Sequence, residues 1–215
     1  MQAFLRKNHF LLRRLHSLSG IVPVGGFLLM HFYENAKSLQ SPEAYNEAVK
    51  AINSLPAVLF LEIFFIFLPL YFHAIYGIYV AMDSRHNVKN YGYERNWAFF
   101  WQRISGLFTL FFVTYHIWQF RFQKALGAYD TGTALPGMPD FHVVAKALSN
   151  NFMMAFYVLG VVAAAYHLCN GIYTFLITWG ITVGPKSQRV SKIVANSLFV
   201  AVSALGIAAA IGFRM

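Results

Sequence analysis

Long runs of uncharged residues dominate the chain, and short segments between them carry most of its charges. Residues 15–33, 104–120, 147–185 and 193–213 contain no Asp, Glu, Lys or Arg, and residues 51–82 contain a single charged residue, Glu62. About 20 apolar residues cross the hydrocarbon core of a bilayer as a helix, so these runs predict five transmembrane helices. Their expected limits are residues 14–34, 57–82, 98–120, 152–176 and 191–212.

Two polar connections carry helix signals of their own. Ser41-Pro42-Glu43 combines an N-cap, a first-turn proline and an early acid, which predicts a short helix ending near Asn53. A second short helix is expected after Asp140, in a connection rich in Gly and Pro. Both are expected to cover the outer end of the helix bundle.

The composition agrees with a membrane protein. Of the 215 residues, 58% are hydrophobic and 12% are charged, about half the charged share of a soluble domain. This excludes an ordinary soluble domain and a disordered chain. The single cysteine excludes a disulfide framework, a cysteine-rich zinc site and a cysteine-ligated iron–sulfur cluster. We expect one all-α membrane domain over residues 1–215.

The basic residues predict the orientation. The net charge of +9 is more typical of membrane topology than of nucleic-acid binding. An inner N-terminus gives eleven inner and six outer basic residues, which favours a cytoplasmic N-terminus and an outer C-terminus. The inner set is Arg6, Lys7, Arg13, Arg14, Arg85, Lys89, Arg95, Arg103, Lys186, Arg189 and Lys192, and the outer set is Lys37, Lys50, Arg121, Lys124, Lys146 and Arg214.

Histidines inside the predicted spans carry the candidate chemistry. His31, His73, His116 and His167 lie in four different spans, and ionisable residues inside a membrane usually face the bundle interior. The sequences after His73 and His167 share the pattern H-x3-G-I-Y. Ser-Gly pairs at residues 19–20 and 105–106 form a weaker echo in the first and third spans. Together these patterns predict two related helical hairpins followed by a fifth helix.

The depths of these histidines group them in pairs. His31 and His116 lie near the outer ends of their spans, whereas His73 and His167 lie nine or ten residues from the inner ends, about 15 Å away. Two imidazole pairs at two levels are what two stacked haems require, with one imidazole on each side of each iron. We therefore predict all four as axial ligands. His16 competes for the inner level, but we expect it to contact a propionate, another subunit or water.

Glu62 is the one acid deep inside a span. It precedes His73 by eleven residues, which in an α-helix places it on nearly the same face and about 16 Å nearer the outer side. Its functional interpretation is a proton acceptor for quinol oxidation, or a proton relay to the outside. The alternative is a buried structural acid held by hydrogen bonds.

Three motifs carry a resemblance to a known family. Residues 13–20 (RRLHSLSG), 68–77 (LPLYFHAIYG) and 178–189, which begin TWGITV and end PKSQR, resemble the cytochrome b membrane anchor of succinate:quinone oxidoreductases. The match is to the dihaem type with a single five-helix subunit, which includes fumarate reductases.

The resemblance implies cofactors, partners and a location. It implies that His31 and His116 ligate a distal haem b and that His73 and His167 ligate a proximal haem b. It further implies a bacterial cytoplasmic membrane, and partners on the cytoplasmic side: an FAD-containing flavoprotein that performs the dicarboxylate chemistry, and an iron–sulfur protein. Menaquinone would react near the outer side, and the basic inner loops would suit haem propionates and the iron–sulfur protein.

Two alternatives remain open on the sequence. One is the cytochrome b subunit of another quinone-linked oxidoreductase, such as a hydrogenase or formate dehydrogenase. The other is a haem-free, proton-coupled transporter that uses the histidines and Glu62 as a relay.

Overall fold

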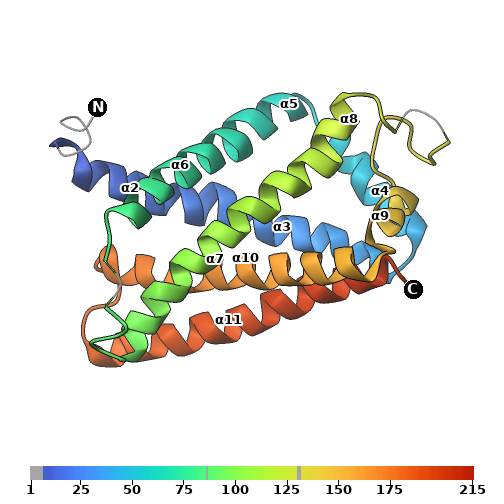
Figure 1. The fold of residues 1–215 in the computed structure, drawn as a ribbon. Coiled ribbons are helices and arrows are strands. Elements are labelled where there is room, and N and C mark those ends of the chain that lie inside the picture. The colour runs from blue at the N-terminus through green and yellow to red at the C-terminus, as the bar shows by residue number, and fades with distance from the viewer. Residues whose placement is uncertain (1–6, 86, 130–131) are drawn as a thin grey trace.

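Every regular element in the described part of the chain is helical. The computed structural model describes residues 7–85, 87–129 and 132–215 (Figure 1). The predicted all-α class is therefore confirmed. Arg6, one of the predicted inner basic residues, lies outside the described residues.

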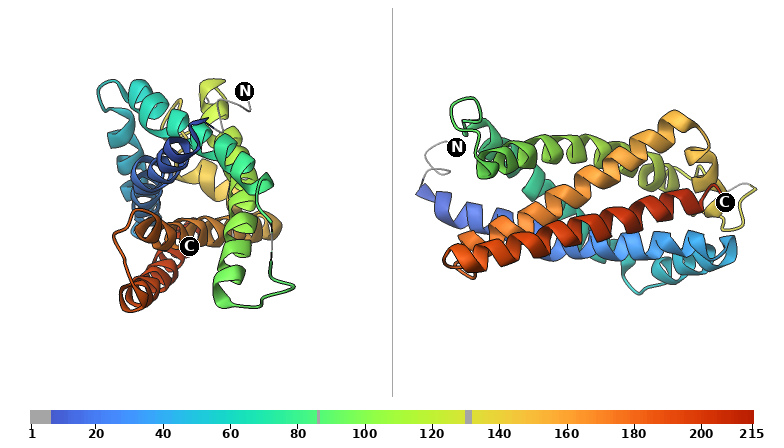
Figure 2. Two further views of the ribbon diagram at one scale, coloured as in Figure 1. Left: turned by 90° about the vertical axis from the view of Figure 1, so that its left-hand side faces the viewer. Right: turned by 90° about the horizontal axis from the view of Figure 1, so that it is seen from below.

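The elements join end to end into long rods that run along the molecule (Figures 1 and 2). Four of the five rods extend beyond the predicted spans at one or both ends, because their helices continue into the neighbouring polar segments. The rod Val58–Met82 begins one residue later than predicted and ends where predicted. The first contains α2 (His9–Ser19), η1 (Gly20–Gly25), α3 (Gly26–Asn35) and η2 (Ala36–Leu39), and the second contains α5 (Val58–Leu61), η3 (Glu62–Phe67) and α6 (Leu68–Met82). The others are α7 (Glu94–His116) with η4 (Ile117–Phe122) and α8 (Gln123–Ala125), then α10 (Asn151–Thr178) and α11 (Pro185–Gly212).

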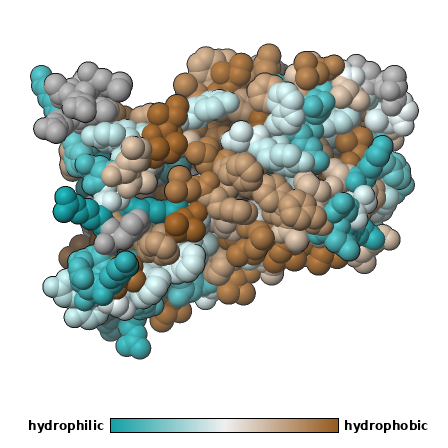
Figure 3. Space-filling model, in the orientation of Figure 1, coloured by the Kyte–Doolittle hydropathy of each residue, from teal (hydrophilic) through white to brown (hydrophobic). Residues whose placement is uncertain are grey.

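Four of these rods are long and apolar enough to cross a membrane: His9–Leu39, Val58–Met82, Asn151–Thr178 and Pro185–Gly212. The rod formed by α7 and η4 contains the predicted third span, but polar residues such as His116 and Gln119 interrupt it, and its crossing stays a prediction. Hydrophobic residues cover most of the middle of the visible face, and hydrophilic residues gather at both ends (Figure 3). This distribution is that of a protein embedded in a bilayer.

The two ends of the bundle differ. Helix α2, the described residues of the 83–93 connection and the 179–184 turn lie at one end, here called the inner end (Figures 1 and 2). The short helices α4 (Pro42–Asn53) and α9 (Phe141–Leu148) lie at the opposite, outer end with the C-terminus (Figures 1 and 2). Which end faces the cytoplasm stays a prediction.

The two short outer helices confirm the capping signals. The Ser41 hydroxyl accepts a hydrogen bond from the Ala44 amide at 3.1 Å and so caps α4. The fully buried Asp140 carboxylate accepts from the Val143 amide at 3.0 Å and the Ala134 amide at 2.7 Å. The two helices are joined to each other, because the Phe141 amide donates to Asn46 Oδ1 at 2.8 Å.

Small residues allow α10 and α11 to pack closely. Ala165 of α10 is completely buried, and Ala209 of α11 is 3% exposed. A Cβ at Gly206 would lie 2.7 Å from Val161 and 2.8 Å from Phe32, so only glycine fits where α11 meets α10 and α3. Because lipid provides no hydrophobic drive for helix association, such close contact is a main source of attraction between these helices.

Three rods contain a wide, π-helical segment, and each segment changes the register of the helix after it. Pro23 lies inside η1, where its missing N–H disrupts the α-helical ladder, and η3 ends just before Leu68 and Pro69. A π segment adds about one residue to a turn, which rotates the later residues by about 100° relative to a continuous α-helix. The eleven-residue spacing from Glu62 to His73 spans η3, so the expectation that they share a helix face does not hold for this geometry.

Asp140→Ala is expected to destabilise the outer end. The substitution removes both oxygen acceptors of a fully buried carboxylate. The amides of Ala134 and Val143 then lack an acceptor, which lowers the free energy of unfolding by about 1–3 kcal/mol. Thermal unfolding of the purified protein in detergent measures the effect. The control is Asn150→Ala, which removes an exposed cap bonded to the Phe152 amide and is expected to cost about 1 kcal/mol or less. Equal melting temperatures for Asp140→Ala and the unmodified protein would contradict this account.

Candidate functional site

The structure brings the four intramembrane histidines together in the two expected pairs. The ring centres of His31, on α3, and His116, at the end of α7, are 5.6 Å apart. Those of His73, on α6, and His167, on α10, are 6.0 Å apart. In both pairs the ring planes are close to perpendicular, at 77° and 84°. Each pair thus joins one helix of the first hairpin to one helix of the second.

The inner pair is held by backbone carbonyls of neighbouring helices. His73 Nδ1 lies 2.9 Å from the carbonyl oxygen of His16, and His167 Nδ1 lies 3.0 Å from that of Gln102. A carbonyl accepts only, so these contacts favour the tautomer with a proton on Nδ1 and a lone pair on Nε2. The Gln102 amide nitrogen lies 3.2 Å from the same Nδ1 of His167. The Gln102 amide also donates to the His167 carbonyl at 3.0 Å and accepts from the Asn170 amide at 2.7 Å.

His16 belongs to this inner site in a way the sequence did not predict. Its ring stacks on that of His73, with ring centres 4.2 Å apart and planes 7° from parallel. Its side chain was expected to meet a propionate, another subunit or water, but the contact with the greatest structural consequence is made by its backbone carbonyl. Neither this carbonyl nor Gln102 was identified from the sequence, since a backbone acceptor leaves no side-chain signal.

At the outer pair, the ring nitrogens have polar side chains as their neighbours. The Asn35 amide nitrogen lies 3.4 Å from the ring nitrogens of His31 and donates to the His31 carbonyl at 2.7 Å. The Tyr157 hydroxyl lies 3.5 Å from His116 Nδ1 and donates to Gln119 Oε1 at 2.5 Å. Aromatic rings, including that of Phe112, pack against His116. The outer level is therefore bounded by groups that can rotate and exchange hydrogen bonds.

Glu62 pairs with an arginine whose role as its partner was not predicted from the sequence. Arg121 donates to Glu62 Oε2 from Nε at 3.0 Å and from Nη2 at 2.7 Å. Glu62 opens the π segment η3, and Arg121 lies in η4. Arg121 comes five residues after His116, which places it about one π-helical turn further along the same rod.

Lys124 adds a second cation at this corner. Its ammonium donates to Asn53 Oδ1, which ties α8 to the end of α4. Burial and the neighbouring Arg121 lower the pKa of Lys124, and Glu62 opposes this shift. The outer corner therefore combines one carboxylate with two cationic side chains.

Basic residues at the inner end connect the helices there. The Arg14 guanidinium lies 5.1 Å from the ring centres of both Phe10 and Trp179, and the Trp179 indole donates to Ser17 Oγ at 3.0 Å. Arg103 donates to Ser84 Oγ at 2.7 Å. These contacts fix the ends of the rods and leave a positively charged surface at the inner end.

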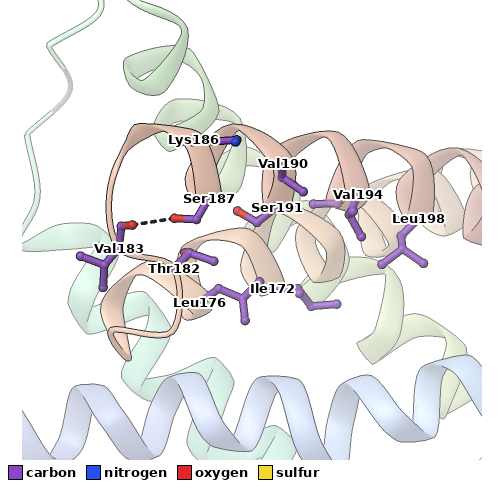
Figure 4. A pocket seen from close by; sticks show the side chains of 11 residues that line it. Ile172, Leu176, Thr182, Val183, Lys186, Ser187, Val190, Ser191, Val194 and Leu198 are labelled. Atoms are coloured by element: carbon purple, nitrogen blue, oxygen red, sulfur yellow. Dashed lines mark hydrogen bonds between the residues drawn. The ribbon is translucent and has the colours of Figure 1, made fainter.

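A separate apolar groove of about 680 Å³ runs between α10 and α11 near the inner end (Figure 4). Its walls come from residues such as Leu176, Val190 and Val194, and Lys186 and Ser187 stand at its polar rim. The Ser187 hydroxyl donates a hydrogen bond to the Val183 carbonyl at 2.8 Å. Cys169, on α10, is 2% exposed, which agrees with a packing role.

The donor set of each histidine pair fits a haem. A metal–imidazole bond is about 2 Å long, so two imidazoles on opposite sides of one metal have ring centres about 6 Å apart. Both pairs meet this separation. Metal-bound histidines commonly donate their second ring N–H to a carbonyl, as His73 and His167 do.

Comparison with known proteins identifies relatives of the whole chain. A model of the family described as succinate dehydrogenase/fumarate reductase transmembrane subunit matches residues 9–98 and 87–209. The chain is 43% identical over 204 residues to the succinate dehydrogenase cytochrome b558 subunit of Bacillus subtilis (strain 168). The aligned residues make up 95% of this chain and 96% of that protein. No solved structure is significantly similar to the chain.

Proposed function

The chain belongs to the family of succinate dehydrogenase/fumarate reductase transmembrane subunits, and from this we propose that it is a dihaem cytochrome b that carries electrons between an iron–sulfur subunit and menaquinone. The observation that carries the proposal is the meeting of four intramembrane histidines in two pairs. Family membership also disfavours both alternatives that the sequence left open.

We assign one haem position to each histidine pair. His73 and His167 would hold the inner, proximal haem b, and His31 and His116 the outer, distal one. Gln102, at the inner level, and His116, at the outer level, lie fourteen residues apart on α7. The two histidine levels are therefore about 20 Å apart along this helix. When bound, each haem supplies one-electron redox chemistry.

The inner end provides the surface for the partner subunits. Its basic residues, including Arg14, Arg95 and Arg103, favour a cytoplasmic location for this end by the positive-inside rule. On this orientation an iron–sulfur subunit and an FAD-containing flavoprotein sit at the inner end, and the dicarboxylate chemistry takes place in the flavoprotein. The chain would act as one membrane-anchoring domain in a bacterial cytoplasmic membrane, with its C-terminus outside.

The outer end provides the site for menaquinone. Glu62 is our candidate for accepting the quinol proton, because it is the one carboxylate deep inside a predicted span among the described residues. Arg121 holds Oε2 of this carboxylate in place. Movement of a charge between the two sides of the membrane is coupled to the membrane potential at about 2.3 kcal/mol per 100 mV.

The haem assignment predicts the effect of removing one inner ligand. His73→Ala and His167→Ala should each lower the haem b content from two per chain to one, because an iron that loses one imidazole from this site is no longer held. The measurement is a pyridine haemochrome assay with a reduced-minus-oxidised spectrum of the purified complex. His9→Ala, at an exposed position on α2, serves as the control and should keep both haems. Two haems with unchanged spectra in either inner variant would show that the assignment is wrong.

The assignment of Glu62 predicts a loss confined to quinone chemistry. Glu62→Gln keeps the size of the side chain but removes the proton acceptor, so menaquinone-linked turnover should fall about 100-fold. Succinate oxidation with a soluble dye acceptor, and the content of both haems, should stay at the wild-type level. Glu47→Gln, on the exposed side of α4, is the matched control. Normal menaquinone-linked turnover in Glu62→Gln would assign Glu62 a purely structural role.

A further inference from the structure

A five-residue pattern occurs once in each hairpin, on the helix that precedes an inner histidine. Residues 16–20 read HSLSG on α2 and η1, and residues 102–106 read QRISG on α7. Both stretches end in Ser-Gly, and in both the first residue provides the carbonyl that accepts from the histidine Nδ1. The Ser-Gly pairs thus belong to the inner histidine level, although each stands in the helix that carries an outer histidine.

The serine of each pattern contacts the same carbonyl. Ser19 Oγ donates to the His16 carbonyl at 3.0 Å, and Ser105 Oγ donates to the Gln102 carbonyl at 3.2 Å. The His16 carbonyl also accepts from the Gly20 amide within the helix. The hydroxyl and the imidazole therefore share its two lone pairs with that amide. The two hairpins therefore repeat the same three-group contact, formed by a carbonyl, a serine hydroxyl and an imidazole.

The glycine of each pattern makes room for the ring. A Cβ at Gly20 would lie 2.3 Å from Cε1 and 2.6 Å from Nδ1 of His73. A Cβ at Gly106 would lie 2.6 Å from Cε1 and 3.0 Å from Nδ1 of His167. Each glycine stands four residues after the carbonyl-bearing residue, on the same helix face. The imidazole thus lies over the glycine with its Nδ1 against the carbonyl.

We propose that these two patterns are seats that position the inner haem ligands, with Gly20 and Gly106 as the positioning residues. The carbonyl fixes Nδ1 as the protonated nitrogen, and the glycine lets the ring reach that carbonyl, so that Nε2 of His73 and of His167 is presented to the iron. This inference rests on the proposed haem-binding function. It goes beyond that function by assigning the residues that set the tautomer and orientation of the ligands.

The outer pair provides an internal control. Its ring nitrogens face the side chains of Asn35 and Tyr157 at 3.4 and 3.5 Å, so its orientation does not depend on either seat. A methyl group at Gly20 or Gly106 must displace an inner ring and should leave the outer pair in place.

The test compares glycine-to-alanine variants of the full chain in its complex. Gly20→Ala and Gly106→Ala each place a methyl group where the histidine ring lies in its seat. Gly26→Ala is the matched control, because it lies in the same rod as Gly20 and its Cβ would meet no atom within 4 Å. The readouts are haem b per chain, the low-temperature optical spectrum and the EPR g values, which distinguish the two haems.

The expected result is selective damage at the inner level. Both seat variants should lose the inner haem or show changed g values for it, with haem affinity there weakened roughly 10–100-fold. The outer haem should keep its wild-type signal in both, and Gly26→Ala should resemble wild type throughout. Retention of the outer haem also shows that the variant chain has folded.

Two outcomes would overturn the proposal. Inner-haem signals identical to wild type in both seat variants would show that the rings do not need the seats. Equal loss of both haems would show that the glycines serve general helix packing. A wild-type protein with fewer than two haems would instead contradict the proposed function, so the two failures can be told apart.

Discussion

A bilayer offers no water to a buried polar group, and this constraint determines which helices of the bundle must touch. His73 can lie inside the membrane because the His16 carbonyl on α2 accepts its N–H, and His167 depends in the same way on the Gln102 carbonyl of α7. Glu62 meets Arg121 across a third contact, between η3 and η4. The pairing of polar groups therefore adds to the close packing of α10 against α11 in fixing the mutual positions of the helices.

The parts of the fold that depend on local signals could be predicted. Uncharged runs mark the long helices, and the caps at Ser41 and Asp140 mark the two short ones. The histidine pairing could also be predicted, because the depth of a residue in a membrane helix is set by its distance to the helix end. His31 and His116, for example, are near the outer ends of two spans and meet there.

Other features depend on tertiary contacts, which the spacing of residues along the sequence does not determine. Arg121 lies beyond the apolar run of its helix, so nothing local marks it as the partner of Glu62. The π segment η3 shifts the register between Glu62 and His73, whereas their expected shared face required a regular α-helix there. The Ser-Gly pairs at residues 19–20 and 105–106 could be recognised in the sequence as a repeat between the two hairpins. Their contact with the inner histidines depends on how the helices pack, which the sequence pattern does not contain.

The two histidine levels differ in a way that suits different chemistry. At the inner level the ring N–H groups of His73 and His167 end on backbone carbonyls, which neither gain nor lose protons near neutral pH. At the outer level the histidines adjoin a tyrosine hydroxyl and a side-chain amide, which can rearrange their hydrogen bonds. The Glu62–Arg121 pair lies about one π-helical turn beyond His116 along the same rod. On the proposed function, the inner level passes electrons, and the carbonyl contacts hold its two rings in a fixed orientation. Quinone chemistry moves protons with electrons, and the outer level is where this chain concentrates groups able to accept or relay them.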